Sequence, residues 1–419
     1  MNHAVKHAMC GAEPGLISVD QALEFIQQYC PPLQTESIPL GTALNRCLAK
    51  DIYSEIHLPL FTQSAVDGYA ICTETDQLIA ENTYFDVIGE SRAGEISSIS
   101  LLPGQAIRIF TGAATPKNTT TVARQEIVQL HPKSHRIQLI QTLKPHADIR
   151  DRGEELISGA CLAKKGQRLN VGAIASLSMV GVDSVCVYVQ PKIVVIITGD
   201  EVAQTVQDFE SGKIFDANGP LIQTWFQQQH LDVEIMYVSD GKQAVFELFD
   251  LLKDQYDLVI TTGGVSVGDY DFVRPVALDL GFEQIFWKVK QKPGKPMLFS
   301  KYTRQDKSQC LLLGLPGNPA AVYVGMHIYV SMLLDRLQGH QQSLPWFSAV
   351  STTALKKDAR DRFLRMSAHF EDGVLKLTNL SKQQSHMLSN LMQANCLVRI
   401  PADQTIDVGQ ILHGLFIQY

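Results

Sequence analysis

Between Lys192 and about Gly339, short apolar runs alternate with longer stretches in which apolar residues recur at helical spacing. The apolar runs are rich in β-branched residues, as in strands buried on both faces of a sheet, and they read KIVVIIT, VEIMYV, DLVIT and CLLLGL. The helical stretches read GPLIQTWFQQQH, GKQAVFELFDLLKD and NPAAVYVGMHIYVSMLLDRL. This alternation predicts βαβ crossovers, and therefore a parallel sheet in a three-layer α/β domain.

Two further segments carry helix signals. Residues 15–50 are predicted to be helical, with a capping box formed by Ser18 and Gln21 and a helix end at Pro31-Pro32. A second helix is predicted for the stretch NVGAIASLSMVG, because its Asn170 is a suitable N-cap and its Gly181 a suitable C′ residue.

Two other segments are typical of β structure. Residues 66–143 contain short strand-like runs between Gly, Pro and Asn turns, and the chain after Gln341 is again strand-like, with a hairpin predicted at Glu371-Asp372-Gly373. The fold class is therefore multidomain α/β plus β. The predicted domains are a discontinuous helical and linker domain (1–55 and 145–185), an inserted β-rich domain (56–144), the central α/β domain (186–339) and a C-terminal β-barrel-like domain (340–419).

The composition argues against several classes of protein. No apolar run approaches the ~20 residues of a membrane span, and the N-terminus lacks an apolar signal stretch, so a cytoplasmic location without membrane contact is expected. The eight cysteines include no Cys-x-x-Cys pair, which argues against a structural zinc site. A net charge of −7 argues against a nucleic-acid binder. One cationic cluster, WKVKQKPGKP, favours a small anionic ligand, although a solvated lysine face is the alternative.

The stretch ITTGGVSVGDYDF predicts a ligand site at the end of a buried strand. Its glycines permit close backbone approach to a ligand, and the carboxylates of Asp269 and Asp271 border them. A P-loop is excluded because Asp269 and Tyr270, rather than Lys and Ser or Thr, follow Gly268. Carboxylates next to a glycine loop that could hold a phosphate suggest a divalent cation that bridges the carboxylates and the phosphate. The alternative is an ordinary glycine-rich turn in which an Asp caps the next helix.

Polar residues follow each predicted strand of the α/β domain, and the carboxyl ends of parallel strands meet at one edge of a sheet. The sequence therefore predicts one site from four loops, with Asn318 capping a helix that faces the anion and with metal-binding oxygens from Glu201, Asp240 and Asp271. For each acid alone, a helix N-cap or a surface charge is the alternative. The converging residues are Thr198, Gly199, Asp200, Glu201, Ser239, Asp240, Thr261, Thr262, Gly263, Gly264, Leu315, Pro316, Gly317, Asn318 and Pro319.

Several long motifs resemble one enzyme family. TGDE (198–201), TGGVSVGDYD (262–271), KPGKP (292–296) and LPGNPAA (315–321) are similar to the motifs of the molybdopterin molybdenumtransferases, the MoeA family that also occurs fused in gephyrin. Outside the α/β domain, QSAVDGYA (63–70), RIFTGAA (108–114) and RDRGEEL (150–156) resemble further motifs of the same family. The resemblance covers nearly the whole chain.

The resemblance implies insertion of molybdate into adenylylated molybdopterin, with release of AMP and dependence on Mg²⁺ or another divalent cation. It implies a homodimer in which the β-rich domain of one subunit completes the site of the other, and it suggests a molybdopterin adenylyltransferase as a partner. The catalytic residues would be Asp67, Thr111, Glu201, Asp240 and Asp271, with Glu201, Asp271 and Asp67 at the metal. Ligand-binding residues would be Thr198, Gly199, Asp216, Asn218, Gly263, Gly264, Ser266, Gly268, Lys288, Lys292, Lys295, Pro316, Gly317, Asn318, Pro319, Arg360 and Ser385.

The chain departs from the family pattern at Val66, Ala114, Glu155 and Gly241, and the last of these replaces the second acid of an Asp pair. Gly241 leaves open a diverged paralogue with weak activity. Two other functions also stay open: a molybdopterin adenylyltransferase, which uses the same α/β module, and a scaffold protein, as gephyrin also is. Stimulation of AMP release by molybdate would separate metal insertion from adenylylation, which consumes ATP instead.

Overall fold

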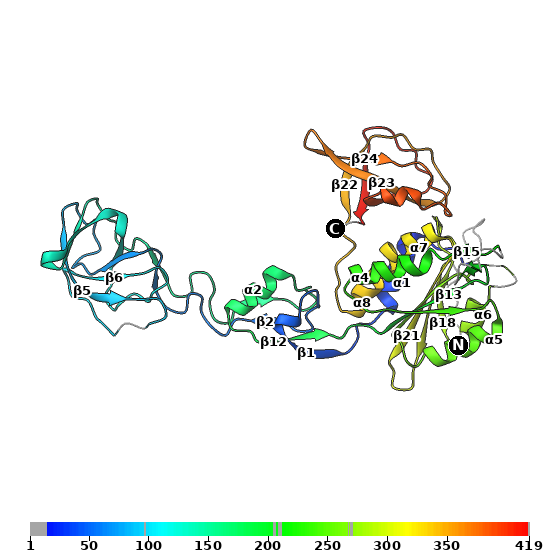
Figure 1. The fold of residues 1–419 in the computed structure, drawn as a ribbon, viewed down its shortest axis with the longest axis horizontal. Helices are drawn as coiled ribbons and strands as arrows, with labels where there is room; N and C mark the ends of the chain where they lie inside the picture. Colours follow the sequence, from blue (N-terminus) through cyan, green and yellow to red (C-terminus); the bar gives the residue numbers. More distant parts are fainter. Residues whose placement is uncertain are drawn as a thin grey trace. The chain divides into compact units, whose positions relative to one another are not determined.

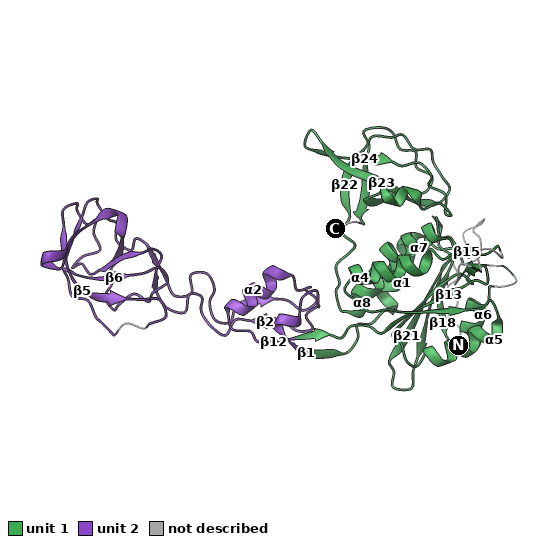
Figure 2. Cartoon of the chain, in the orientation of Figure 1, with its two compact units in different colours: residues 1–36, 186–419 green, residues 37–185 purple. Residues whose placement is uncertain are grey.

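A computed structural model describes residues 15–95, 98–203, 207, 212–266, 268 and 271–417. The chain forms two compact units, one of residues 37–185 and one of residues 1–36 and 186–419 (Figure 2). Asp269, one of the acids predicted at the glycine loop, lies outside the described residues. In the part of the chain that the structure describes, every helix is too short or too polar to cross a lipid bilayer.

The larger unit contains the predicted three-layer α/β domain, which is confirmed (Figure 1). Its six-stranded sheet has the order β16-β13-β17-β21-β20-β18. The first four strands are parallel, but β20 pairs antiparallel with both β21 and β18, so the expectation of an all-parallel sheet was wrong at β20, which runs opposite to the other five strands. The strands are Glu234–Val238 (β16), Ile193–Thr198 (β13), Leu258–Thr262 (β17), Gln309–Leu315 (β21), Leu298–Thr303 (β20) and Glu283–Trp287 (β18).

Two apolar cores lie on opposite faces of this sheet. Val195 and Ile197 of β13 pack into one core, together with α1, α4, α7 and α8, whereas Val194 and Ile196 pack into the other, with α5 and α6 (Figure 1). Burial on both faces explains why the strand sequence is continuously apolar rather than alternating. The helices are Val19–Tyr29 (α1), Asn218–Gln228 (α4), Lys242–Leu252 (α5), Val273–Asp279 (α6), Pro319–Gly325 (α7) and Ser331–Leu337 (α8), with a π-helical turn over Met326–Val330 between the last two.

The N-terminal helix α1 has the predicted capping box, because Ser18 Oγ accepts from the Gln21 N–H and Gln21 Oε1 accepts from the Ser18 N–H. The helix ends at Tyr29, before the two prolines. Beyond it, the expectation of helix up to residue 50 was wrong. Thr35–Pro39 (β1) and Ile52–Tyr53 (β2) are strands, and Leu40–Thr42 forms a single 3₁₀ turn.

The C-terminal β domain belongs to the same unit. Its strands β23, β24, β22, β26 and β25 pair in that order, and β25 pairs again with β23, which closes a five-stranded barrel. The predicted hairpin at Glu371-Asp372-Gly373 is confirmed, because Asp372 and Gly373 both have positive φ between β23 and β24. The strands are Phe347–Ser351 (β22), Asp361–Glu371 (β23), Val374–Asn379 (β24), Cys396–Ile400 (β25) and Ile411–Phe416 (β26).

The smaller unit is mainly β structure, as predicted for residues 66–143. Its six-stranded sheet has the order β7-β4-β6-β5-β9-β8, and β10–β3 and β11–β2 form two further two-stranded pairs. Asn170 caps α2 by accepting from the Ala173 N–H, and Gly181 follows the helix with a φ of +80°, both as predicted. The elements are Gln63–Ser64 (β3), Gly68–Ile71 (β4), Tyr84–Ser91 (β5), Gln105–Ile109 (β6), Thr121–Arg124 (β7), Val128–His131 (β8), Arg136–Leu139 (β9), Ile149–Arg150 (β10), Cys161–Ala163 (β11) and Val171–Met179 (α2).

Candidate active site

A cavity of about 720 Å³ lies at the carboxyl ends of β13, β17 and β21, where the chain leaves each strand for its following loop. The KPGKP turn and two segments of the C-terminal barrel complete its wall. The site residues predicted from the sequence that line this cavity are Thr198, Gly199, Glu201, Asp240, Gly263, Gly264, Ser266, Gly268, Asp271, Lys292, Lys295, Pro316, Gly317, Asn318, Arg360 and Ser385.

Two glycines after β17 let the backbone form the floor of the cavity. Gly263 and Gly264 have φ values of +93° and +66°. A Cβ at Gly263 would lie 2.5 Å from Thr198 Oγ1, and one at Gly264 would lie 2.7 Å from Val273 Cγ2. Both positions therefore require glycine, as the sequence indicated.

The three carboxylates that line the cavity belong to Glu201, Asp240 and Asp271. Asp271 Oδ2 accepts from the Gly268 N–H at 2.6 Å, which folds the acid back over its own loop. Asp240 and Asp200 exchange hydrogen bonds, each carboxylate accepting from the N–H of the other residue. Burial raises the pKa of Asp240, and the negative charges of Glu201, Asp200 and Asp271 raise it further. The charges of three neighbouring acids therefore act on Asp240.

Another part of the cavity wall carries cationic side chains, those of Lys292, Lys295 and Arg360. Lys292 Nζ donates to Asp358 Oδ2 at 3.2 Å, and the Arg360 N–H donates to the other oxygen of the same carboxylate at 3.1 Å. Burial alone would raise the pKa of Asp358, but the hydrogen bonds from Lys292 and the Arg360 N–H outweigh it and lower the pKa. Asp358 was not predicted from the sequence, and it orients two residues that were.

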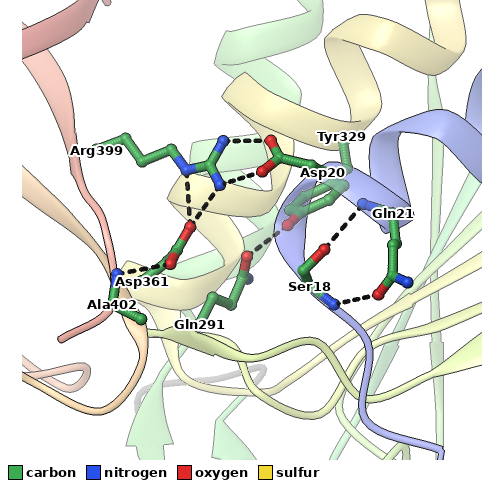
Figure 3. Close-up of polar contacts among 8 residues, drawn as sticks. All are labelled: Ser18, Asp20, Gln21, Gln291, Tyr329, Asp361, Arg399 and Ala402. Atoms are coloured by element: carbon green, nitrogen blue, oxygen red, sulfur yellow. Dashed lines mark hydrogen bonds and ion pairs between the residues drawn. The ribbon is translucent and has the colours of Figure 1, made fainter.

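The turn that carries Lys292 and Lys295 is fixed from behind. Gln291 is fully buried, its Nε2 donates to the Gly294 carbonyl at 3.1 Å, and its Oε1 accepts from the Tyr329 hydroxyl (Figure 3). Gln291 and Lys292 also form the two-residue strand β19 alongside β23 of the barrel. The lysines are therefore held on a rigid turn, as its proline and glycine content indicated.

Ser385 reaches the cavity on a segment of the barrel, residues 382–387. Its carbonyl accepts from the Ala320 N–H in the first turn of α7, at 3.1 Å. Gln383, Gln384 and His386 line the cavity as well. Sequence reasoning missed these three residues, although they flank Ser385 in the motif QQSH, and their position beside it was the available signal. Asn318 occupies the N-cap position of α7, but its side chain makes no capping hydrogen bond, so the predicted capping role was wrong.

Four predicted ligand-binding residues of this unit lie outside the cavity lining. Asp216 accepts from the Tyr237 hydroxyl and from the Asn218 and Gly219 N–H groups, which are the first two backbone donors of α4. Asn218 Nδ2 donates to the Gly317 carbonyl, which connects α4 to a cavity loop. The remaining two are Lys288, whose amine lies 4.2 Å from the centre of the Trp287 ring, and Pro319, the first residue of α7.

Asp67 and Thr111 belong to the unit of residues 37–185 and lie together there. Asp67 Oδ1 accepts from both the N–H and the hydroxyl of Thr111, each at 2.8 Å. These two hydrogen bonds, with a smaller contribution from the charge of Arg108, lower the pKa of Asp67. The second carboxylate oxygen, Oδ2, takes no part in either bond.

Within the described residues, no group of three or more His, Cys, Asp or Glu side chains is arranged to hold a metal ion. Glu201, Asp240 and Asp271 therefore do not form a closed protein cage. A cation bound beside them would therefore need substrate phosphates and water as further ligands, as Mg²⁺ commonly has.

Comparisons with known proteins agree with this architecture. Successive parts of the chain match the family models for the MoeA N-terminal region (domain I and II), residues 17–181; a probable molybdopterin binding domain, residues 194–336; and the MoeA C-terminal region (domain IV), residues 348–413. The solved molybdopterin biosynthesis moeA protein from Pyrococcus horikoshii OT3 is 26% identical, with a TM-score of 0.81, over 96% of this chain and 100% of that one.

Curated relatives match over nearly the full length. The molybdopterin molybdenumtransferase of Haemophilus influenzae is 33% identical over 413 residues, which cover 96% of this chain and 100% of that protein. The Bacillus subtilis enzyme of the same name is 31% identical over 394 residues, which cover 92% of this chain and 90% of that enzyme. These findings confirm the resemblance seen in the motifs, and the chain belongs to the MoeA family of molybdopterin molybdenumtransferases, the enzymes of molybdenum cofactor biosynthesis.

Proposed function

We propose that the cavity of the larger unit binds adenylylated molybdopterin and molybdate together, and that AMP is released as the metal enters the dithiolene. One observation carries this proposal. A single cavity has glycine loops and carboxylates on the side of the α/β domain, and Lys292, Lys295 and Arg360 on the side of the KPGKP turn and the barrel. A phosphate ester and a small oxyanion would thus each meet complementary groups.

The phosphates fit the glycine side. The backbone at Gly263 and Gly264 can approach a ligand closely, because no Cβ stands in the way. Cleavage of the phosphoanhydride places extra negative charge on the leaving phosphate, and a divalent cation neutralises such charge. Glu201 and Asp271 would hold that cation, since the second oxygen of Asp271 remains outside its bond to the Gly268 N–H.

Molybdate fits the cationic side. It is a tetrahedral dianion, and Lys, Arg and hydroxyl groups suit it in the way that they suit phosphate. Lys292, Lys295, Arg360 and Ser385 all line this part of the cavity. Asp358 holds Lys292 and the backbone of Arg360 in place before the anion arrives, which lowers the cost of ordering them on binding.

Release of AMP in the presence of molybdate tests the proposal. Purified protein is mixed with adenylylated molybdopterin and Mg²⁺, with and without molybdate, and AMP is quantified. The proposal expects AMP only when molybdate is present. If the protein instead consumed ATP with molybdopterin and ignored molybdate, it would be an adenylyltransferase.

The cation is tested separately by Asp271→Asn. An amide still accepts from the Gly268 N–H, so the loop keeps its shape, but it is a much poorer ligand for Mg²⁺. AMP release should fall by at least about a hundredfold, as for loss of one important electrostatic group in an active site. Asp279→Asn, in α6 at an exposed ion pair with Lys242 of α5, is the matched control and should keep full activity. Full activity in Asp271→Asn would remove this residue from the cation site.

We also propose that the active enzyme is a homodimer with shared sites. The support is the family motif around Asp67 and Thr111, which lies outside the unit that holds the cavity. Subunits carrying Asp67→Asn and subunits carrying Glu201→Gln would each be inactive alone. A mixture should regain activity, because each heterodimer has one intact site. Proven subunit exchange without any recovery would show that each site uses residues of one chain.

A further inference from the structure

Arg365 is the largest side chain in the described structure with almost no exposed surface. It lies in β23 of the barrel, and only 2% of it is accessible to solvent. No carboxylate among the described residues pairs with its guanidinium, and burial lowers its pKa. A buried charge without a counter-ion is costly, so its hydrogen bonds must compensate for lost hydration.

All of those hydrogen bonds go to one short segment. Nη1 donates to the Met387 carbonyl, Nη2 donates to the carbonyls of Lys382 at 3.0 Å and Gln384 at 3.2 Å, and Nε lies 3.4 Å from Gln383 Oε1. Residues 382–387 form neither helix nor strand, so their carbonyls have no partners in regular secondary structure. The planar fork of Arg365 supplies donors to three of them at once.

The side chain of Gln383 in turn binds the backbone of Arg365. Its Oε1 accepts from the Arg365 N–H at 3.1 Å, and its Nε2 donates to the Arg365 carbonyl at 2.7 Å. The segment is thus bound to both the side chain and the backbone of one residue of β23. The same segment lines the cavity through Gln383, Gln384, Ser385 and His386.

We propose that Arg365 is a positioning residue for the molybdate side of the cavity, because it sets the shape of the segment that presents Ser385. This inference rests on the proposed function of the cavity. Arg365 itself does not line the cavity, so it acts through the segment and not by contact with the ligand. Lysine could keep the positive charge but could not reach the same carbonyls with a planar fork.

The test uses Arg365→Lys in the full-length protein. Its apparent KM for molybdate should rise by about tenfold, the effect of displacing one hydrogen bond to a charged ligand. Turnover at saturating molybdate and affinity for adenylylated molybdopterin should stay near those of the parent. In hydrogen exchange without ligand, amides of residues 382–387 should exchange faster, whereas those of β24 and β26 should not change.

Arg304→Lys is the matched control. Arg304 also donates to three backbone carbonyls, those of Lys253, Tyr256 and Gln309, but it lies in the α/β domain away from the cavity lining. This variant should be destabilised and should keep the parent KM for molybdate. If Arg365→Lys does not fold, Asn390→Ala replaces it, because Asn390 Nδ2 donates to the Ser381 and Lys382 carbonyls from another direction.

An unchanged KM for molybdate in a folded Arg365→Lys protein, or equal rises in Arg365→Lys and Arg304→Lys, would overturn the positioning role. So would unchanged hydrogen exchange of residues 382–387. Failure of the proposed function has a different signature, since the parent protein itself would then release no AMP with molybdate. The exchange measurement would still decide whether Arg365 orders the segment.

Discussion

The guanidinium of Arg399 donates two hydrogen bonds to the carboxylate of Asp20, at 2.5 and 2.9 Å, and joins residues 379 positions apart in the chain (Figure 3). The same guanidinium binds Asp361, whose other oxygen accepts from the Ala402 N–H. Asp20 lies in α1, and Asp361 and Arg399 lie in the barrel. Because Asp361 stands opposite Gln291 in the pairing of β23 with β19, this cluster adjoins the turn that carries the cavity lysines.

Removal of Arg399 should destabilise the larger unit. Arg399→Ala leaves the carboxylate of Asp361, which is 13% exposed, with one fewer charged partner, and we expect a loss of about 3 kcal/mol in the free energy of unfolding. Asp20→Asn should cost less, about 0.5–1 kcal/mol, because the Asp20 side chain is 66% exposed and its charge is screened. Denaturant unfolding followed by fluorescence measures both. Equal effects of the two variants would contradict this ranking.

The contribution of Asp20 should also depend on pH in a defined direction. The hydrogen bonds from Arg399 lower the pKa of Asp20 below its ordinary value of 3.8. The stabilisation is therefore present above that value and is lost as the pH falls through the lower folded-state pKa. The stability difference between the parent protein and Asp20→Asn should be constant near neutral pH and shrink below pH 3.8. A difference that grows on acidification would refute the assignment.

Tyr329→Phe should disturb the turn from behind. The substitution removes the hydroxyl that donates to Gln291 Oε1, and it leaves a buried acceptor without its donor, at a cost of about 1–3 kcal/mol. Tyr323→Phe is a suitable control, since the Tyr323 hydroxyl has no hydrogen-bond partner among the described residues. Chemical denaturation of both variants tests the prediction, which fails if they lose the same amount of stability.

Asp240→Asn should stabilise the protein in the absence of a divalent cation. Burial and the neighbouring acids raise the pKa of Asp240, so the stability linked to its protonated form is present below 3.8 and lost as the pH rises through the folded-state pKa. At pH 7 the amide should therefore gain on the order of 0.5–1 kcal/mol after screening. Added Mg²⁺ should stabilise the parent more than the variant. Thermal melts of the parent and the variant at pH 4 and pH 7, with and without Mg²⁺, test both expectations, and a variant less stable than the parent at pH 7 without Mg²⁺ would contradict the first.

Local sequence signals identified much of the fold because they act over short distances. The apolar run of β13, the capping box at Ser18 and the turn at Asp372-Gly373 each depend on neighbouring residues only. The strand β1, with the sequence TESIP, was missed because it lacks apolar alternation and pairs with Ser184–Tyr188 (β12), far away in the chain. The strands β18 and β20 were missed as well, and the antiparallel direction of β20 was not predictable, since nothing local states the direction of pairing.

The cavity lining was predictable where it uses unusual residues, such as the glycines after β17 and the lysines of the KPGKP turn. The residues that hold the cavity segments in place were not predictable. Asp358 resembles any surface acid in the sequence, and Arg365 resembles any charged residue of a strand. The partners of Arg365 are mainly backbone carbonyls, which every residue has, so no residue pattern reveals them. Only the folded barrel brings that arginine and residues 382–387 together.

The central claim is that molybdate binds at the KPGKP turn, apart from the pterin phosphates, and Lys295→Ala tests it most directly. The measurement is the molybdate dependence of AMP release, with Lys242→Ala, at an exposed ion pair outside the cavity, as control. Loss of one charge-assisted hydrogen bond should raise the apparent KM for molybdate by about ten- to a hundredfold. Excess molybdate should restore turnover, and affinity for adenylylated molybdopterin should change little. If excess molybdate fails to restore turnover while pterin binding collapses, Lys295 holds the pterin phosphate and the account is contradicted.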